Sequence, residues 1–116
     1  MSNPSTAILA ERHVASNLKA GGWKIFAHDL RTPFAQIDVL AVDPDGILVA
    51  VEVKARHPTS WSQGTDCLER KQLSRLKRSL EWLLATRFSG YHARVDLACA
   101  TLPDPTSRPL VWYRDL

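Results

Sequence analysis

The sequence predicts a single α/β domain whose central mixed sheet is flanked by helices, in the order α-β-β-β-α-β-β. Apolar residues recur at helical spacing in two segments, and segments rich in β-branched and aromatic residues occupy much of the rest. A helix between the third and fourth strands implies a parallel crossover, which makes the sheet mixed. A length of 116 residues suits one hydrophobic core and is too short for two.

The composition is that of an ordinary globular protein. Apolar residues make up 45% and charged residues 23% of the chain, and the net charge of +3 does not by itself indicate nucleic-acid binding. No apolar run approaches the roughly 18 residues of a membrane span, and the start of the chain lacks a signal-peptide pattern. These features predict a cytoplasmic protein with no membrane segment.

The first predicted helix follows a frayed tail at residues 1–4. Ser5 or Thr6 can cap its N-terminus, and the helix runs to about Ala20. Gly21-Gly22 then ends it, because glycine accepts the backbone conformation that terminates a helix.

Glu11 falls within the apolar stripe of this helix and not on its polar side. The apolar residues at helical spacing around it are Ala7, Ile8, Val14, Ala15 and Leu18. A carboxylate buried without a partner would be costly or would take up a proton, so an inward-facing glutamate needs a reason. The residues alone leave two interpretations open: a functional carboxylate, or a glutamate at the helix edge that reaches solvent.

Three strands follow the first helix. Aromatic and β-branched residues predict the first strand over 23–30, and a loop leads to the second strand over 37–42. A turn at 43–46 connects this strand to the third, which runs from Ile47 to Ala55. Valines at alternate positions give the third strand a wholly apolar face, which predicts a central place in the sheet.

The turn sets the register of the hairpin formed by the second and third strands. Pro44-Asp45-Gly46 fits a three-residue loop in which proline fixes φ and glycine accepts a positive φ. Counting outward from the pair that closes the loop puts Asp38 opposite Glu52, and the strand period of two puts Lys54 on the same face. Two facing carboxylates repel each other unless a cation lies between them, and a metal ion commonly takes that place.

A second helix is predicted from Thr65 or Asp66 to about Arg87. Its core stripe has spacings of three, four and three, at Leu73, Leu76, Leu80 and Leu83. Off the stripe lies a group of cations that we call the basic ridge: Arg70, Lys71, Arg75, Lys77 and Arg78. The helix alone gives equal weight to a phosphate-binding surface and to an ordinary solvated face.

Two further strands complete the predicted domain. Ser89-Gly90 breaks the second helix, and alternating apolar residues predict a fourth strand from His92 to Leu102. A proline-rich turn then precedes a short last strand from Leu110 to Arg114.

Asp38, Glu52 and Lys54 have the composition of a metal-dependent hydrolytic site. A hard divalent cation such as Mg²⁺ binds carboxylate oxygens, and it can polarise a phosphodiester and lower the pKa of a bound water. A lysine beside that water can orient it and offset developing negative charge. The competing interpretation is a plain structural domain in which Glu52 and Lys54 form an exposed pair on a strand.

Ile37-Asp38 followed by Val51-Glu52-Val53-Lys54 resembles the PD-(D/E)XK nuclease superfamily, which includes archaeal Holliday-junction resolvases. More closely, the chain resembles the bacterial YraN-like family of predicted endonucleases, in motifs that run in order from about Ala10 to Asp115. The matching segments are Ala10-Glu11 with Leu18 and Gly22-Trp23, Arg31 with 35–41, then 51–56, 70–72 and 94–99.

The resemblance implies a restriction-endonuclease-like core and a DNA endonuclease that uses Mg²⁺ or Mn²⁺, with branched or structured DNA as one substrate class. The implied catalytic residues are Glu11, Asp38, Glu52, Lys54 and, as a helper, Gln72; the first three would hold the metal. DNA contacts are expected from Arg56, Arg70, Lys71, Arg75 and Arg78. A homodimer would suit such an enzyme, because cutting both strands of a duplex usually takes two sites.

Two positions depart from the family pattern. The family's Gly-Glu before Ile-Asp is Ala35-Gln36 here, and its proline before Arg-Lys-Gln is Glu69. Gln36 should share a face with Asp38, so the lost charge would weaken metal binding or change the preferred metal. Two hypotheses follow: a metal-dependent endonuclease, or a DNA-binding protein with the nuclease fold that does not cut.

Overall fold

The computed structural model describes residues 4–57 and 68–116, and this part of the chain has the predicted order of elements. These are α1 (Thr6–Ala20), β1 (Lys24–Arg31), β2 (Gln36–Val42), β3 (Leu48–Arg56), α2 (Arg70–Thr86), β4 (Ala93–Thr101) and β5 (Val111–Tyr113). The strands form one sheet in the order β1-β2-β3-β4-β5, in which only the pair β3–β4 is parallel. The predicted mixed α/β fold is confirmed, with β3 at the centre.

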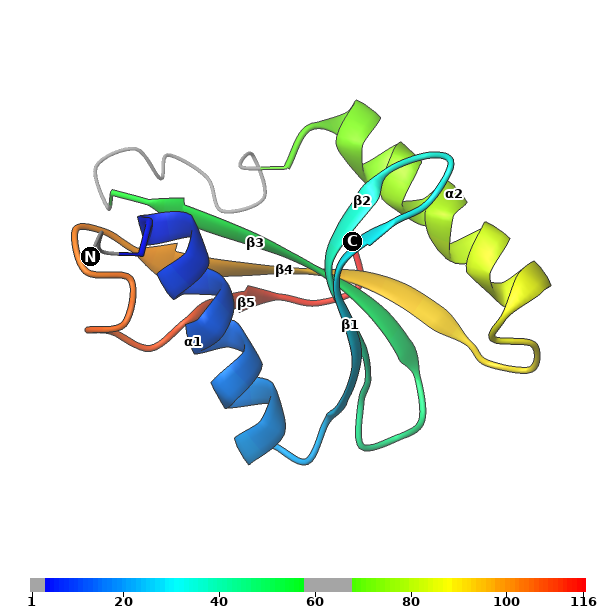
Figure 1. Ribbon diagram of the computed structural model, residues 1–116, viewed down its shortest axis with the longest axis horizontal. Helices are drawn as coiled ribbons and strands as arrows, with labels where there is room; N and C mark the ends of the chain where they lie inside the picture. The colour runs from blue at the N-terminus through cyan, green and yellow to red at the C-terminus, as the bar shows by residue number, and fades with distance from the viewer. Residues whose placement is uncertain (1–3, 58–67) are drawn as a thin grey trace.

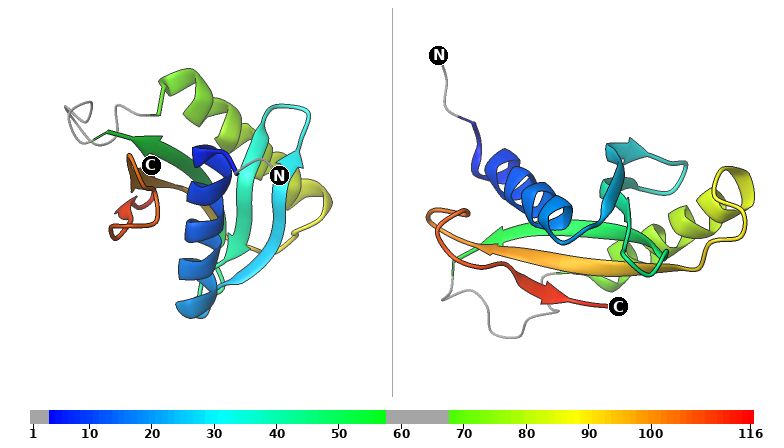
Figure 2. Two further views of the ribbon diagram at one scale, coloured as in Figure 1. Left: turned by 60° about the vertical axis from the view of Figure 1, so that its left-hand side comes forward. Right: turned by 90° about the horizontal axis from the view of Figure 1, so that it is seen from below.

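The two helices cover opposite faces of the sheet (Figures 1 and 2). On one face α1 packs over Val49 and Val51, and on the other the leucines of α2 pack over Leu48 and Ala50. Because these four residues alternate along β3 and are all buried, this strand is covered on both sides. Neither of the two helices in residues 4–57 and 68–116 is long and apolar enough to cross a membrane.

α1 begins and ends where the sequence predicts. The Ser5 hydroxyl accepts a hydrogen bond of 3.2 Å from the Ile8 backbone N–H, and Gly22 follows the helix with a φ of 83°. Ala10, Val14 and Leu18 are buried against the sheet, whereas Ile8 is 45% exposed. The packed stripe of α1 therefore starts about one turn later than the sequence suggests. Of the predicted tail, residues 1–3 lie outside the described residues.

The turn between β2 and β3 has the predicted three-residue loop. The Asp43 N–H donates to the Ile47 carbonyl at 2.9 Å, and the Gly46 N–H donates to the Asp43 carbonyl at 3.0 Å. Gly46 has a φ of 85°, which explains why glycine occupies this position. The Asp43 carboxylate also accepts the N–H groups of Asp45 and Ile47, each at 2.9 Å, so the turn is held by side chain as well as backbone.

The start predicted for the second helix is wrong. Thr65 and Asp66 lie outside the described residues, but Leu68 and Glu69 are not helical and α2 begins at Arg70. Leu68 is buried in the core on the α2 side, and Glu69 then takes an extended conformation with ψ of 150°. Packing of Leu68 thus delays the helix, because its side chain reaches the core from a segment that enters α2 at an angle the helix itself could not provide.

Candidate active site

Asp38 lies where β2 and β3 stop pairing through their backbones. Their register runs from Val42 with Leu48 to Val39 with Val51. One step further, where the register puts Asp38 across from Glu52, Asp38 Oδ2 accepts a hydrogen bond of 2.9 Å from the Val53 N–H. A side chain therefore takes a bond that a strand carbonyl would otherwise make, and the two strands separate at this point.

The alternation of β2 also breaks at Asp38. Val39 and Ala41 pack in the core on the α1 side, whereas Ile37, two residues before Val39, packs in the core on the α2 side. A regular strand would keep all three on one face. The change explains how Asp38 can approach groups from both sides of the sheet.

Glu52 is buried beside Asp38 and is held by two neighbours. The side chain is 6% exposed; its Oε1 atom accepts a 2.7 Å hydrogen bond from Gln72 Nε2 on α2 and lies 3.3 Å from Lys54 Nζ. No donor in the described part of the chain reaches the other oxygen, Glu52 Oε2. A buried carboxylate oxygen without a donor is costly in a protein interior, so this atom has the properties of a ligand position.

The electrostatics of the pair favour a bound cation. Burial raises the pKa of Glu52 to about 7, and the neighbouring charge of Asp38 raises it further against the opposing effect of Lys54. Burial also raises the pKa of Asp38, although the Val53 N–H favours its ionised form. Two crowded carboxylates with raised pKa values lose their mutual repulsion when a cation lies between them.

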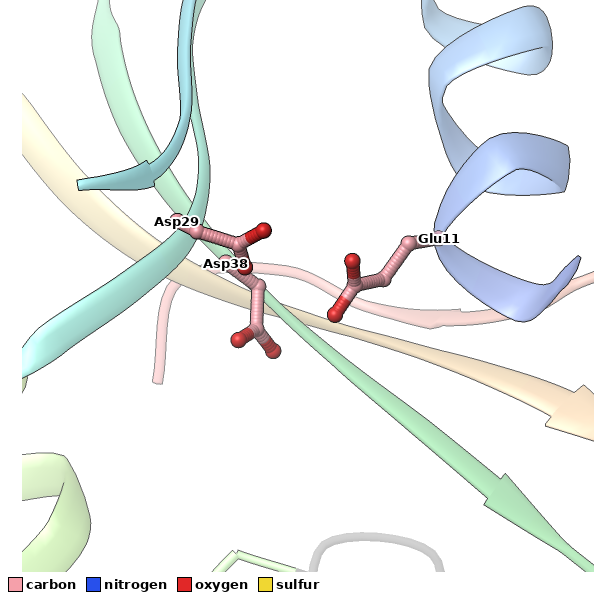
Figure 3. Close-up of side chains that lie close together, drawn as sticks. All are labelled: Glu11, Asp29 and Asp38. Carbon is pink, nitrogen blue, oxygen red and sulfur yellow. The ribbon is translucent and has the colours of Figure 1, made fainter. Parts of the chain in front are cut away.

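Glu11 completes a second carboxylate group on the other side of Asp38. Carboxylate oxygens of Glu11, Asp29 and Asp38 all lie within 4.8 Å of one another. Figure 3 shows the Glu11 side chain reaching from α1 toward the two aspartates on β1 and β2. The pKa of Glu11 is raised by burial first and by the charges of Asp29 and Asp38 next. Of the two interpretations of Glu11, the geometry corresponds to the inward-facing one.

Sequence reasoning missed Asp29. Its neighbours His28 and Leu30 pair with Val39 and Ile37, which places Asp29 across from Asp38. Asp29 has a φ of 49°, a left-handed conformation that aspartate tolerates better than most residues. A count back from Asp38 through the preceding loop could have found it, but the register of β1 on β2 depends on an irregularity between Ile25 and Ala27 that the sequence does not announce.

Gln36 contacts Asp29 and not Asp38. Its Nε2 atom donates to Asp29 Oδ1 at 3.4 Å. A glutamate in this place would repel Asp29, whereas the amide can orient it. The carboxylate that the YraN-like pattern leads one to expect at position 36 is thus absent, and a carboxylate from β1 stands beside it.

The residues present fit a divalent metal ion. Asp38 could contribute to both groups, with Glu52 on one side and Glu11 and Asp29 on the other. All the candidate ligands are carboxylates, which suits Mg²⁺ or Mn²⁺ better than a softer metal. The donor-free Glu52 Oε2 is the observation of this structure that fits a metal most directly.

Comparison with protein families supports the resemblance found in the sequence. The family described as "Uncharacterised protein family UPF0102" matches residues 10–99. The chain belongs to this family. A UPF0102 protein of Syntrophus aciditrophicus (strain SB) is 34% identical over 105 residues, covering 86% of this chain and 79% of that protein. Another, from Bifidobacterium longum (strain NCC 2705), is 28% identical over 106 residues, covering 90% of this chain and 86% of that protein.

A solved structure shares the fold of this UPF0102 protein. A repair endonuclease from Pyrococcus abyssi superposes with a TM-score of 0.51 over 90% of this chain, at 19% sequence identity. The chain spans 42% of that endonuclease. The likeness concerns the arrangement of helices and strands, and it agrees with the restriction-endonuclease-like core that the sequence resemblance implies.

The basic ridge of this UPF0102 protein does not face one way. All five of its side chains are exposed on α2. Lys71 and Arg75 line a groove of about 520 Å³ together with Gln36 and Gln72, next to Glu52. Arg78 stacks over the Phe34 ring at 5.1 Å. Lys77 lines a different hollow with the C-terminal residues 115–116, away from this groove.

The remaining expected DNA contact, Arg56, lies at the end of β3. It is half-buried, and its Nη1 atom donates to the carbonyl of Ala55 at 2.9 Å. It precedes the segment 58–67, which lies outside the described residues. The structure thus brings Glu11, Asp38, Glu52, Lys54 and Gln72 together and leaves Arg56 at the margin.

Proposed function

We propose that this protein is a metal-dependent endonuclease that hydrolyses phosphodiester bonds in DNA, with branched or structured DNA as one substrate class. The observation that carries the proposal is the meeting of Asp38, Glu52 and Lys54 where β2 and β3 separate. The buried pair of carboxylates, the lysine 3.3 Å from Glu52 and the donor-free Glu52 Oε2 are what hydrolysis of a phosphodiester requires at one point.

Each residue of the site has a distinct role in this proposal. Asp38 and Glu52 hold the metal ion, and Glu11 and Asp29 contribute from the other side of Asp38 directly or through water. When bound, Mg²⁺ or Mn²⁺ would polarise the phosphodiester and lower the pKa of a coordinated water. The Lys54 ammonium orients the attacking water and offsets negative charge on the phosphorus centre.

Two contacts hold the carboxylates in place. Gln72 fixes one oxygen of Glu52 from α2, which leaves the other oxygen directed away from the amide. The Val53 N–H fixes Asp38 in the same way. Such contacts set the orientation of a ligand, and their loss commonly costs 10–100-fold, in order of magnitude, in metal affinity or activity.

A second candidate function is DNA binding without cleavage. Gln36 favours it, because the structure has an amide at a position where the family resemblance implies a carboxylate. Asp29 beside Gln36 favours the enzyme, because it supplies a negative charge to the same area. A homodimer would allow cleavage of both strands, and sedimentation of the protein with and without duplex DNA tests this part of the proposal.

The test is incubation of the purified protein with branched, single-stranded and duplex DNA in the presence of Mg²⁺, Mn²⁺ or EDTA. The enzyme proposal expects internal cuts with a metal ion, none with EDTA, and none with the Asp38→Asn variant. Glu81→Gln, which changes an exposed carboxylate on α2, serves as the matched control and should cut like the parent. Metal-independent binding without cuts on any DNA would replace the enzyme proposal with the second candidate.

A further inference from the structure

A second polar groove lies on the opposite side of the acidic centre from the basic ridge. It has a volume of about 540 Å³ and runs between α1 and β1. Two of the carboxylates, Glu11 and Asp29, lie at one wall. The remaining polar side chains are those of Arg12, Ser16, Lys19 and His28. Nothing in the sequence motifs assigns a role to these four.

The spacing of the α1 residues places them along one side of the helix. Arg12, Ser16 and Lys19 are separated by four and three residues, so their side chains lie in a row. Seven residues of helix span about 10 Å. This equals about three steps of a nucleic-acid strand at roughly 3.4 Å per step. The row can therefore contact successive phosphates of one strand with two cations and a hydroxyl.

The two grooves are continuous through the acidic centre. Asp29 borders the α1 groove, and its hydrogen bond from Gln36 leads to the groove that Lys71 and Arg75 line. The order across the face is cations, carboxylates, cations. A strand laid along it would have phosphates neutralised on both sides while one phosphate lies over the carboxylates, where a metal ion is needed.

We propose that the α1 groove binds the DNA backbone on the far side of the scissile phosphate, through Arg12, Lys19, Ser16 and His28. The proposal rests on the proposed function, because it names the substrate path of the same site. A site that holds the strand on both sides acts within a strand. An enzyme that acts at a strand end would need only one such groove.

The experiment measures DNA affinity against salt concentration in EDTA, so that no cleavage step enters the readout. The parent is compared with Arg12→Ala/Lys19→Ala and with a control double variant, Lys24→Ala/Lys77→Ala, which removes two exposed cations outside both grooves. Each lost phosphate contact flattens the log–log slope by about 0.7 on single strands and about 0.9 on duplex DNA. The groove variant should lose about 1.4 to 1.8 of slope, and the control should keep the parent's slope.

A third variant, Ser16→Glu, adds a negative charge to the groove without removing a cation. Ser16 is exposed on α1, so the fold should tolerate the change, and DNA affinity should fall at low salt. The inference is overturned if the parent binds DNA and Lys71→Ala/Arg75→Ala flattens its slope while the α1 variants behave like the control; the proposed function would survive that result. A parent that binds no DNA at all would overturn both.

Discussion

The Asp38 carboxylate accepts a 2.9 Å hydrogen bond from the Val53 backbone N–H, across the point where β2 and β3 separate. This bond joins the fold to the proposed chemistry, because one oxygen of Asp38 completes a strand pair and the other remains for a ligand. Substitutions of Asp38 should therefore separate a structural effect from a metal-binding effect.

Asp38→Asn should be more stable than Asp38→Ala. Asparagine keeps a carbonyl oxygen for the Val53 N–H, whereas alanine leaves that buried donor without a partner, at a cost of about 1–3 kcal/mol. Both variants should lose Mn²⁺ binding, because neither has the carboxylate. Denaturant unfolding in EDTA measures the difference in stability, and calorimetry measures the metal. Equal stabilities of the two variants, or parent-like Mn²⁺ binding by either, would contradict this account of Asp38.

Glu52 should make the metal-free protein less stable as the pH rises. Its pKa is raised from 4.5 to about 7 in the folded state, so the folded protein binds more protons than the unfolded chain between these values. The free energy of unfolding should fall through this window, by an amount on the order of 3 kcal/mol, and stay low above it.

Glu52→Gln should remove this part of the pH dependence and be more stable than the parent at pH 8 in EDTA. Denaturant unfolding at pH 5 and pH 8 checks both statements. The matched control is Glu81→Gln, whose carboxylate is exposed and which should follow the parent at both pH values. An unchanged pH dependence in Glu52→Gln would show that another group titrates in this window.

Lys54 should matter for cleavage much more than for folding. Lys54→Met keeps most of the apolar stem and removes the ammonium that lies 3.3 Å from Glu52 Oε1. Loss of one such electrostatic group lowers a rate by about 10²–10³-fold. The cleavage rate and the thermal midpoint are measured together at saturating Mn²⁺, which replaces Lys54 as the partner of Glu52. Parent-like cleavage would remove Lys54 from the chemical step, and a large fall in the midpoint would give it a structural role.

The basic ridge should divide into residues that contact DNA and one that does not. Lys71→Ala and Arg75→Ala should each flatten the salt dependence of duplex binding by roughly 0.9, because both line the groove next to Gln72. Lys77→Ala should leave the slope unchanged, because Lys77 lines a separate hollow. If all three variants keep the slope of the parent, the ridge is a solvated helix face.

Arg94 should be essential for stability. It bonds to Asp96, which is fully buried, and to Asp43 in the turn between β2 and β3. It also holds the pKa of Asp43 below its usual value, although burial opposes this. Arg94→Met leaves two buried carboxylates without their cation, which should cost about 3–5 kcal/mol.

Denaturant unfolding measures this cost, and Arg108→Met, at an exposed arginine, is the control. The depressed pKa of Asp43 means that its contribution is present above about pH 4, the ordinary pKa, and is lost as the pH falls through the lower folded value. The parent should therefore lose stability in acid more steeply than Arg94→Met. A loss of under about 1 kcal/mol in Arg94→Met would mean that the network is not needed to hold the turn.

The sequence determined those parts of the protein that depend on short-range chain geometry. The three-residue loop ending in Gly46 allows one register, so the position of Asp38 across from Glu52 follows from counting residues. Capping by Ser5 and termination by Gly21-Gly22 are likewise local, and α1 has the predicted bounds. The helix between the third and fourth strands determined that β3 and β4 are parallel, as the structure has them.

Only the tertiary structure decided which groups join this pair. Asp29 reaches Glu11 and Asp38 because β1 pairs with β2 through an irregularity and because α1 crosses the sheet at that point, and neither follows from a spacing in the chain. The start of α2 depends on where Leu68 finds space in the core, and the division of the basic ridge depends on which hollows border the helix. Turn and cap geometry involve residues a few positions apart, whereas these contacts depend on how two packed layers settle against each other, and the packing energy of the whole core sets that.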